Sequence, residues 1–438
     1  MRADVCRKER ERPRVAGKSA IHDVPATVSS PPKPLSPFVA LHHRDYLLLL
    51  VGRFVSTIGR QMQTVAIAYQ VYQFHHSTLD LGLIGLFRIV PVVTFSLLGG
   101  VLADVVDRRR LMLLTQPLLM SYSVALALLT AAGMVNLGVI YGFTFLAAAT
   151  GALDMPARQA IIPALVPREH LPNALSWNIT VMEVAMIAGP ALGGVAIGAI
   201  GIAGTYAFDA VGFLAVISAL LLMRARLGAA SAGGERGWKA AVQGLGFVRR
   251  NDIVLSVMSL DFFATFWGSA SVLLPAFAER ILHIGPAGLG ILYSAPAIGS
   301  VIGAVVMTGL SNRIRKPGFP LLIAVAAFGL ATVGFGFSRS MPLAILFLAG
   351  TGLTDTVSMT LRHQILQLLT PDGLRGRVTA ANQVFVQGGP QLGQLEAGAV
   401  AAGFGIPFSI ISGGIACVAI VALIGWRNPA IRQYRIER

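Results

Sequence analysis

The chain has 438 residues, of which 55% are hydrophobic and 13% are charged. Soluble globular proteins carry about 25% charged residues, so this composition places the chain in a lipid bilayer. The net charge is +15, but the basic residues lie in short clusters between apolar stretches. That pattern is typical of membrane topology and argues against nucleic-acid binding. With two cysteines, Cys6 and Cys417, a disulfide framework is not expected.

Residues 1–44 combine basic and acidic residues with proline and contain no apolar run. A signal peptide needs an apolar core of about 7–15 residues, so we expect a cytoplasmic tail without fixed structure. Gly17-Lys18-Ser19 matches the end of a nucleotide-binding loop. Because Arg12 stands where the first glycine belongs, we expect neither ATP nor another cofactor to bind there.

Twelve apolar segments follow the tail, each long enough to cross about 30 Å of hydrocarbon. They are 46–72, 80–103, 111–131, 135–154, 178–200, 204–223, 253–277, 287–310, 319–338, 342–361, 378–402 and 406–426. The more polar stretch 224–252 separates six segments from six. The sequence therefore predicts an all-α membrane protein with two six-helix halves, 45–223 and 253–426, a cytoplasmic central loop, and a C-terminal tail, 427–438.

Basic residues gather in the first tail, in the loops after even-numbered spans and in the C-terminal tail. The opposite loops contain only Arg280 and Arg339. Since basic loops stay on the cytoplasmic side, we expect both termini in the cytoplasm.

Two groups of residues recur about 200 positions later. Arg158, Pro167 and Asn178 return as Arg362, Pro371 and Asn382, and residues 188–193 return as residues 388–393. Duplicated multi-helix halves are typical of secondary transporters, in which the substrate crosses between the repeats. The repeat makes transport the leading hypothesis.

The end of span 2 reads G-G-V-L-A-D-V-V-D-R-R-R over residues 99–110. Here the chain resembles the major facilitator superfamily, whose loop between helices 2 and 3 reads roughly G-x-L-A-D-x-x-G-R-R, although Asp107 replaces the second glycine. Small residues allow close helix approach, and an aspartate is favoured at a helix N-terminus. We expect a gating role for Gly100, Asp104, Arg108 and Arg109; the alternative is a solvated turn. The matching loop 309–316 lacks the acid, which predicts a stronger latch in the first half.

Residues 154–159 and 162–167 narrow the resemblance to a branch of bacterial drug and siderophore exporters that also includes macrolide efflux proteins. Residues 188–194 resemble an antiporter-associated motif of the family. The resemblance implies the twelve-helix fold, export across the bacterial inner membrane and further gating residues, namely Asp154, Arg158, Gly189, Pro190 and Gly193. The alternative for the three residues of span 5 is close packing alone.

Charges within the spans are informative because each costs about 2.5–3.5 kcal/mol at a helix centre. They are Arg53, Arg60, Arg88, Glu183, Asp261, Asp355 and Glu396, all on helices that line the cavity in the resembled family, and Asp209 on outward-facing span 6. We assign the substrate or proton pathway to Arg60, Gln63, Gln70, Arg88, Glu183, Asp261, Asp355 and Glu396. A structural ion pair is the alternative for each acid.

Arg60 lies near the middle of span 1, where we expect it to pair with Glu183 or Asp261 or to attract an acidic or catecholate substrate. Gln63 and Gln70 share one face of that span and can hydrogen-bond an amphiphile. Adjacent His75 and His76 lack the further ligands of a metal site.

These features predict a secondary active exporter that works by alternating access, with protons as the coupling ion. A catecholate siderophore such as enterobactin is the first substrate candidate, and multidrug or macrolide efflux is the alternative. A non-transporting receptor is a more distant one. We expect no enzymatic activity, because no H-E-x-x-H or G-x-S-x-G motif occurs. The expected partners are the bilayer, a small molecule and protons, and we expect a monomer.

Overall fold

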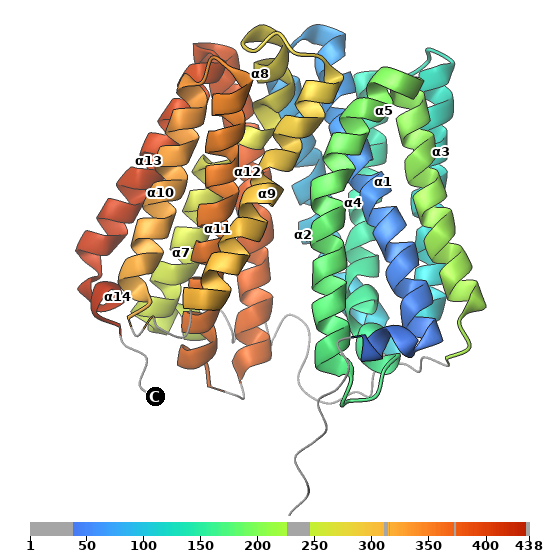
Figure 1. Ribbon diagram of the computed structural model, residues 1–438, viewed down its shortest axis with the longest axis horizontal. Helices are drawn as coiled ribbons and strands as arrows, with labels where there is room; N and C mark the ends of the chain where they lie inside the picture. The colour runs from blue at the N-terminus through green and yellow to red at the C-terminus, as the bar shows by residue number, and fades with distance from the viewer. Residues whose placement is uncertain (1–37, 226–245, 311–313, 315, 372–373, 435–438) are drawn as a thin grey trace, which may run out of the picture. The chain divides into compact units, whose positions relative to one another are not determined.

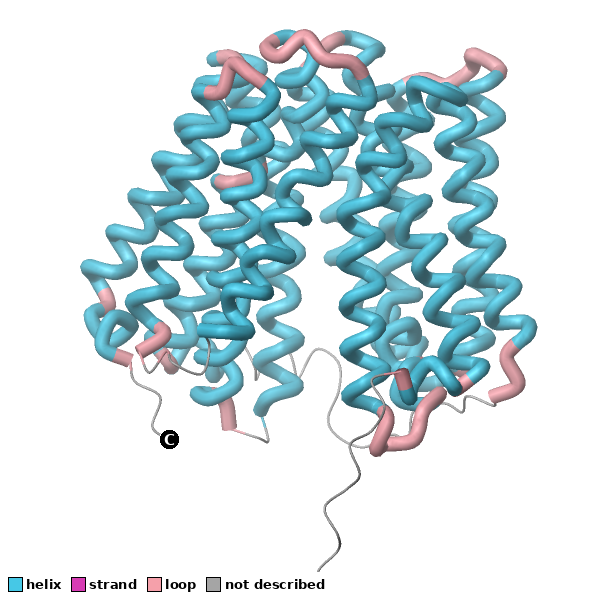
Figure 2. The backbone as a smooth tube through the Cα atoms, in the orientation of Figure 1, coloured by secondary structure: helices cyan, strands magenta, loops and turns pink. Residues whose placement is uncertain are grey.

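The computed structural model describes residues 38–225, 246–310, 314, 316–371 and 374–434, and every regular element in those ranges is a helix. Of the expected segments, residues 1–37 and 226–245 lie outside this description. The first half contains η1 (Val39–His42), α1 (Arg44–His75), α2 (Thr78–Val105), α3 (Arg108–Ala131), α4 (Leu137–Ala160), η2 (Ile162–Ala164) and α5 (Leu171–Leu222). Figures 1 and 2 show these helices running roughly side by side.

The second half contains a similar set. Its elements are α7 (Asp252–Trp267), η3 (Ala270–Leu273), α8 (Leu274–Arg280), α9 (Pro286–Leu310), α10 (Gly318–Phe337), α11 (Met341–Leu369), α12 (Arg375–Phe404), α13 (Ile406–Arg427) and the short α14 (Pro429–Gln433). A short α8 lies at one end of the bundle, at the top of Figure 1.

The 52-residue α5 is two spans joined at a kink. Gly201 within it has φ 74°, a conformation that glycine adopts without steric cost. The break falls between the two predicted segments 178–200 and 204–223. Spans 5 and 6 are therefore both present.

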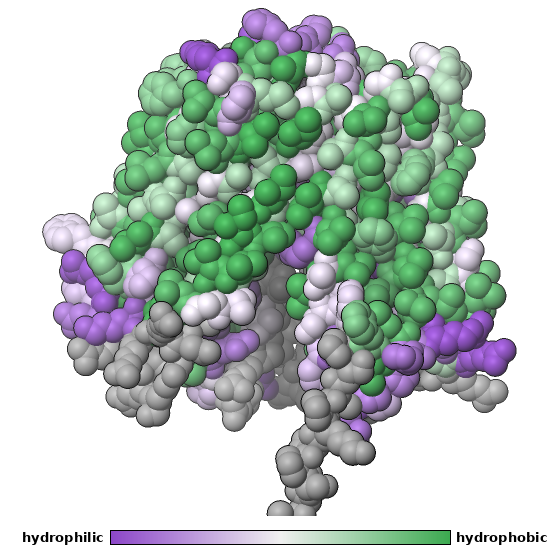
Figure 3. Space-filling model, in the orientation of Figure 1, coloured by the Kyte–Doolittle hydropathy of each residue, from purple (hydrophilic) through white to green (hydrophobic). Residues whose placement is uncertain are grey.

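Nine helices of the described chain are long and apolar enough to cross a membrane, with α5 counted once. The polar and charged residues of α1 and α12 lower their hydropathy, although the two helices have 32 and 30 residues and complete the halves. With α5 counted as two spans, twelve segments cross, and the predicted all-α fold with two six-helix halves is confirmed. On the face drawn in Figure 3, an apolar belt lies between more polar ends, as expected of a membrane protein.

The predicted span 253–277 is interrupted. The helix α7 ends at Trp267, and η3 and α8 follow. The Gly268 amide closes α7 by donating to the Ala264 carbonyl, and Pro275, in the first turn of α8, has no amide hydrogen to continue the ladder. Hydropathy alone does not reveal this break, because all of these residues are apolar or small.

Glycines bring the two halves together at the end that holds α8. A Cβ atom on Gly82 of α2 would lie 3.1 Å from the Gly398 Cα of α12, and one on Gly290 of α9 would lie 2.9 Å from the Gly194 Cα of α5. Such contacts need residues without side chains, as in other membrane helix interfaces. Thr78 also donates to the Gly398 carbonyl at 3.2 Å.

Candidate functional site

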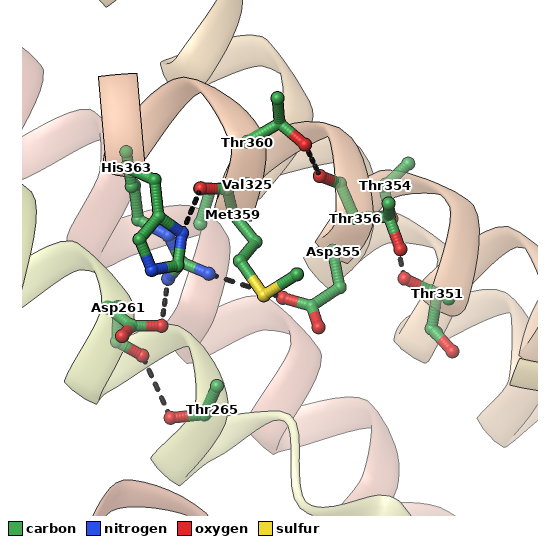
Figure 4. Close-up of polar contacts among 12 residues, drawn as sticks. Asp261, Thr265, Val325, Thr351, Thr354, Asp355, Thr356, Met359, Thr360 and His363 are labelled. Atoms are coloured by element: carbon green, nitrogen blue, oxygen red, sulfur yellow. Dashed lines mark hydrogen bonds and ion pairs between the residues drawn. The ribbon is translucent and has the colours of Figure 1, made fainter. Parts of the chain in front are cut away.

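A buried charge cluster lies in the second half, where α7 meets α11. Arg362 of α11 donates to the Asp261 carboxylate of α7 and, at 3.5 Å, to the Asp355 carboxylate of its own helix. Arg362 and Asp261 are each 6% exposed, whereas the Asp355 side chain is 47% exposed. Figure 4 shows Asp261 and Asp355 approaching the cluster from different helices.

This cluster contains two carboxylates and one arginine. Two ionised carboxylates around one guanidinium leave one negative charge uncompensated, so uptake of one proton neutralises the group. Asp355 makes the longer contact with Arg362 and is the more exposed of the two carboxylates.

The first half has a related cluster on α4 and α3. The Asp154 carboxylate is 1% exposed and accepts hydrogen bonds from Thr115 at 2.7 Å, Gln116 at 2.9 Å and Arg158. Asp154 and Arg158 lie four residues apart on one helix face. Because every hydrogen-bond partner of Asp154 in the described part of the chain lies on α3 or α4, this cluster ties the two helices together.

The predicted gating loop between α2 and α3 is partly described. Asp107, the residue that replaces the family's second glycine, caps α3 by accepting from the Arg110 amide at 3.0 Å. Arg109 donates to the Leu220 and Leu221 carbonyls in the last turn of α5. Both therefore hold helix ends in place.

Three other residues of that loop complete the predicted gating group. The surroundings of Gly100 and the side chain of Asp104 lie outside what the structure describes, and Arg108 lies in the first turn of α3. A gating role for this group stays a prediction.

Gly189, Pro190 and Gly193 place α5 between α1 and the other half. A Cβ on Gly193 would lie 2.8 Å from the Met62 Cα, and one on Gly189 would lie 3.1 Å from the Ile58 carbonyl oxygen. A Cβ on Gly290 of α9 would lie 2.6 Å from the Pro190 carbonyl oxygen. These residues lie at the seam between the halves, and their gating role stays a prediction.

Glu183 lies on the side of α5 that faces the second half. Ile187, Pro190 and Gly194 all contact α9, and Glu183 precedes Ile187 by four residues on the same helix face. Neither Glu183 nor Glu396 of α12 has a hydrogen bond or ion pair within the described part of the chain. Both stay candidates for the pathway.

Arg88 of α2 approaches Tyr293 of α9 from the other half, near enough for the two groups to interact electrostatically. Arg88 is half-buried and, among the residues described, makes no hydrogen bond or ion pair. Because α2 packs on α12 and α9 packs on α5, the two residues come from helices that join the halves. A cation beside a phenol suits an anionic or aromatic ligand.

Arg60, in the middle of α1, has a different environment from the one expected. Its guanidinium lies over the Phe213 ring, 5.5 Å from the centroid, and its electrostatic neighbours include Asp209. The expected pairing with Glu183 or Asp261 is not made in the described structure, and Asp261 pairs with Arg362 instead. The sequence analysis did not assign Asp209 to the substrate or proton pathway. Its position as the one charged residue on a span expected to face outward was the signal that could have identified it.

Gln63 and Gln70 face the interior of the first half. Gln63 donates to Ser123 of α3 at 3.0 Å, and Gln70 donates to Thr130 of α3 and accepts from Tyr206 of α5. Their amides are engaged in contacts between helices, so direct ligand contact stays a prediction for both.

Polar residues also join the halves beside α8. His76 lies 3.2 Å from the Glu279 carboxylate, Gln73 donates to that carboxylate at 3.2 Å, and Arg280 donates to the His76 carbonyl at 2.7 Å. We call this group the α8 contact. It joins the halves at the end of the bundle opposite η1 and α14 (Figure 1).

Two similar six-helix halves with buried charge clusters define a membrane transporter of the major facilitator type. Residues 35–434 match the family of transmembrane secretion effectors, and the chain belongs to that family of the major facilitator superfamily. The enterobactin exporter EntS of Escherichia coli O1:K1 / APEC is 28% identical over 397 residues, covering 88% of this chain and 94% of that protein. EntS of Citrobacter koseri (strain ATCC BAA-895 / CDC 4225-83 / SGSC4696) is 27% identical over 336 residues, covering 77% and 80%.

Solved structures show the same fold. A bacterial homolog of the human lysosomal transporter Spinster, in an inward-facing and occupied conformation, is 14% identical with a TM-score of 0.72, covering 92% of this chain and 100% of that one. A POT family transporter in complex with a thioalcohol-conjugated peptide is 11% identical with a TM-score of 0.73, covering 89% and 96%.

Proposed function

We propose that the protein is a secondary active exporter that moves a small molecule out of the cytoplasm by alternating access and exchanges it for protons. The observation that carries the proposal is the cluster of Asp261, Asp355 and Arg362. Asp355 is partly exposed and shares the buried Arg362 with a second carboxylate, Asp261. With both acids ionised the group carries one net negative charge, which the binding of one proton neutralises. Each charge cluster lies within one half, whereas the α8 contact joins the two halves, which move relative to each other when such a transporter rocks.

The proposed substrate is a catecholate siderophore such as enterobactin. Two relatives named as enterobactin exporters support it, and each covers most of this chain. Arg88 beside Tyr293 adds physical support, because a guanidinium and a phenol suit a ligand that is both aromatic and anionic. We further propose the bacterial inner membrane as the location and a cytoplasmic position for both termini.

The experiment compares siderophore secretion with and without the protein. A bacterial strain that makes enterobactin and lacks this transporter should accumulate it inside, and expression of the wild-type chain should restore it in the medium. An Arg88→Gln protein that inserts normally is the matched variant, and it should restore less extracellular enterobactin than wild type. Unchanged extracellular enterobactin, together with resistance to macrolides on expression, would favour drug efflux and reject the siderophore proposal.

A further inference from the structure

A carboxylate in the first half has no role in the proposal above. Asp209 lies in the second span of α5, beyond the kink at Gly201, and is 0% exposed. A Cβ on Gly59 of α1 would lie 2.9 Å from the Asp209 Cα and 3.2 Å from its Oδ1. Gly59 is near the centre of the 32-residue α1. Asp209 is therefore a buried acid near mid-membrane, within one half of the transporter.

The carboxylate has only one hydrogen-bond partner in the described structure. Ser123 of α3 donates to Oδ2 at 2.6 Å, while Oδ1 is buried without a partner. Its neighbour Arg60 has a buried Nη2 that also lacks one. Buried polar atoms are nearly always satisfied, and exceptions among charged groups point to function. The two opposite charges are electrostatic neighbours, yet no ion pair within 4 Å joins them among the described residues.

The surroundings of Ser123 fit both protonation states of Asp209. When the carboxylate is charged, the Ser123 hydroxyl accepts from Gln63 at 3.0 Å and donates to Oδ2. When Oδ2 carries a proton, it donates to Ser123, whose hydrogen then turns to the Leu119 carbonyl at 3.3 Å. One hydroxyl rotation accommodates the proton, so neither state leaves Ser123 unsatisfied.

We propose that Asp209 binds and releases one proton in each transport cycle, with Arg60 as the charge that its ionised form neutralises. This inference rests on the proposed function, since it assigns a second proton-binding group to the same exporter. The proton binds from the aqueous side to which the space between the halves is open at that stage of the cycle. It is released to the other side after the halves have alternated.

The neighbours of Arg60 suggest how proton binding reaches the first-half cluster. Its charged neighbours are Asp209 on α5, Asp154 and Arg158 on α4, and Arg53 on its own helix; α3 contributes the neutral Ser123. When Asp209 is ionised, it competes with Asp154 for the positive charge of Arg60. When Asp209 is neutral, Asp154 is the remaining acidic neighbour of Arg60, and it is shared among Arg60, Arg53 and Arg158. The hold of Asp154 on Arg158 is then weaker.

The first test needs no substrate and reads the proton directly. Infrared difference spectra of the purified full chain, taken between acidic and alkaline pH, separate the carbonyl stretch of a protonated carboxylic acid from carboxylate bands. We expect one titrating carbonyl band to vanish in Asp209→Asn and to remain in Asp209→Glu. The matched control, Asp252→Asn on an exposed position of α7, should keep it. In Arg60→Gln the band should titrate at higher pH, because the cation that favours the carboxylate is gone.

The second test uses enterobactin as the probe in proteoliposomes. Asp209→Asn should lose accumulation driven by a pH gradient while it keeps exchange of labelled for unlabelled enterobactin, which needs no net proton movement. An unchanged carbonyl band in Asp209→Asn would overturn the inference, as would gradient-driven accumulation equal to wild type. If wild type itself moves no enterobactin, the substrate proposal fails while the infrared result still decides the role of Asp209.

Discussion

Arg158 and Arg362 lie 204 residues apart at equivalent positions of the two halves, and each holds a buried aspartate. The partner of Arg158 is Asp154, four residues earlier on the same helix, whereas Arg362 reaches across to Asp261 on α7 and back to Asp355. The first-half ion pair thus lies within one helix and its aspartate accepts further hydrogen bonds from α3, whereas the second-half ion pairs involve two helices and an extra acid. The expectation of a stronger latch in the first half rested on loop 309–316, which lacks an acid; the acids that hold Arg362 lie within α7 and α11 instead.

We expect Arg362→Gln to destabilise the protein more than the double change Asp261→Asn with Arg362→Gln. Removing the guanidinium alone leaves a buried carboxylate unpaired, which costs about 3–5 kcal/mol, while the double change leaves two neutral amides. Thermal unfolding in detergent measures the difference. A double variant no more stable than Arg362→Gln would show that Asp261 does not depend on this arginine.

The cluster around Asp154 should respond in graded steps. Thr115→Ala removes one of several hydrogen bonds, worth about 1 kcal/mol, and should slow transport modestly. Asp154→Asn removes the charge that holds Arg158 and should reduce the initial rate of efflux much more. Rates are compared at equal amounts of inserted protein. Equal rates for the two variants would mean that the carboxylate charge has no part in gating.

The glycine contacts between halves give a third prediction. Gly290→Val has no room, because the backbone of Pro190 and Gly194 would lie within 3 Å of the new Cβ. We expect it to separate the halves beside α8 and to lower the unfolding temperature. Gly142→Ala on α4 is the control, since nothing lies within 4 Å of that Cβ, and it should be neutral or stabilise by up to about 1 kcal/mol. Similar unfolding temperatures for the two variants would contradict the close approach.

The α8 contact must open if the halves alternate. In a background of Cys6→Ser and Cys417→Ser, a short bifunctional thiol reagent should link His76→Cys to Glu279→Cys and stop enterobactin export. Each single cysteine variant, treated in the same way, should keep its activity. Continued export by a fully cross-linked protein would show that this end stays closed throughout the cycle.

Much of the fold follows from the sequence because its signals are local. Apolar length predicts each span, and recurrence at about 200 residues predicts two halves. Asp154 and Arg158 could be paired from their spacing of four residues on a helix. The acidic neighbours of Arg362 and Arg60 could not be predicted, because Asp261 and Asp209 lie on other helices. Spacing along the sequence does not indicate which helices are adjacent. The break after Trp267 was missed because hydropathy does not distinguish a continuous span from an interrupted one.

The central claim is exchange of substrate for protons, and gradient-driven transport in proteoliposomes tests it most directly. Wild-type protein reconstituted without ATP should accumulate labelled enterobactin in vesicles whose interior is more acidic than the medium. A protonophore should abolish the accumulation, and reversal of the gradient should reverse the direction of net movement. Accumulation that is the same with and without the gradient and is insensitive to the protonophore would contradict proton-coupled export.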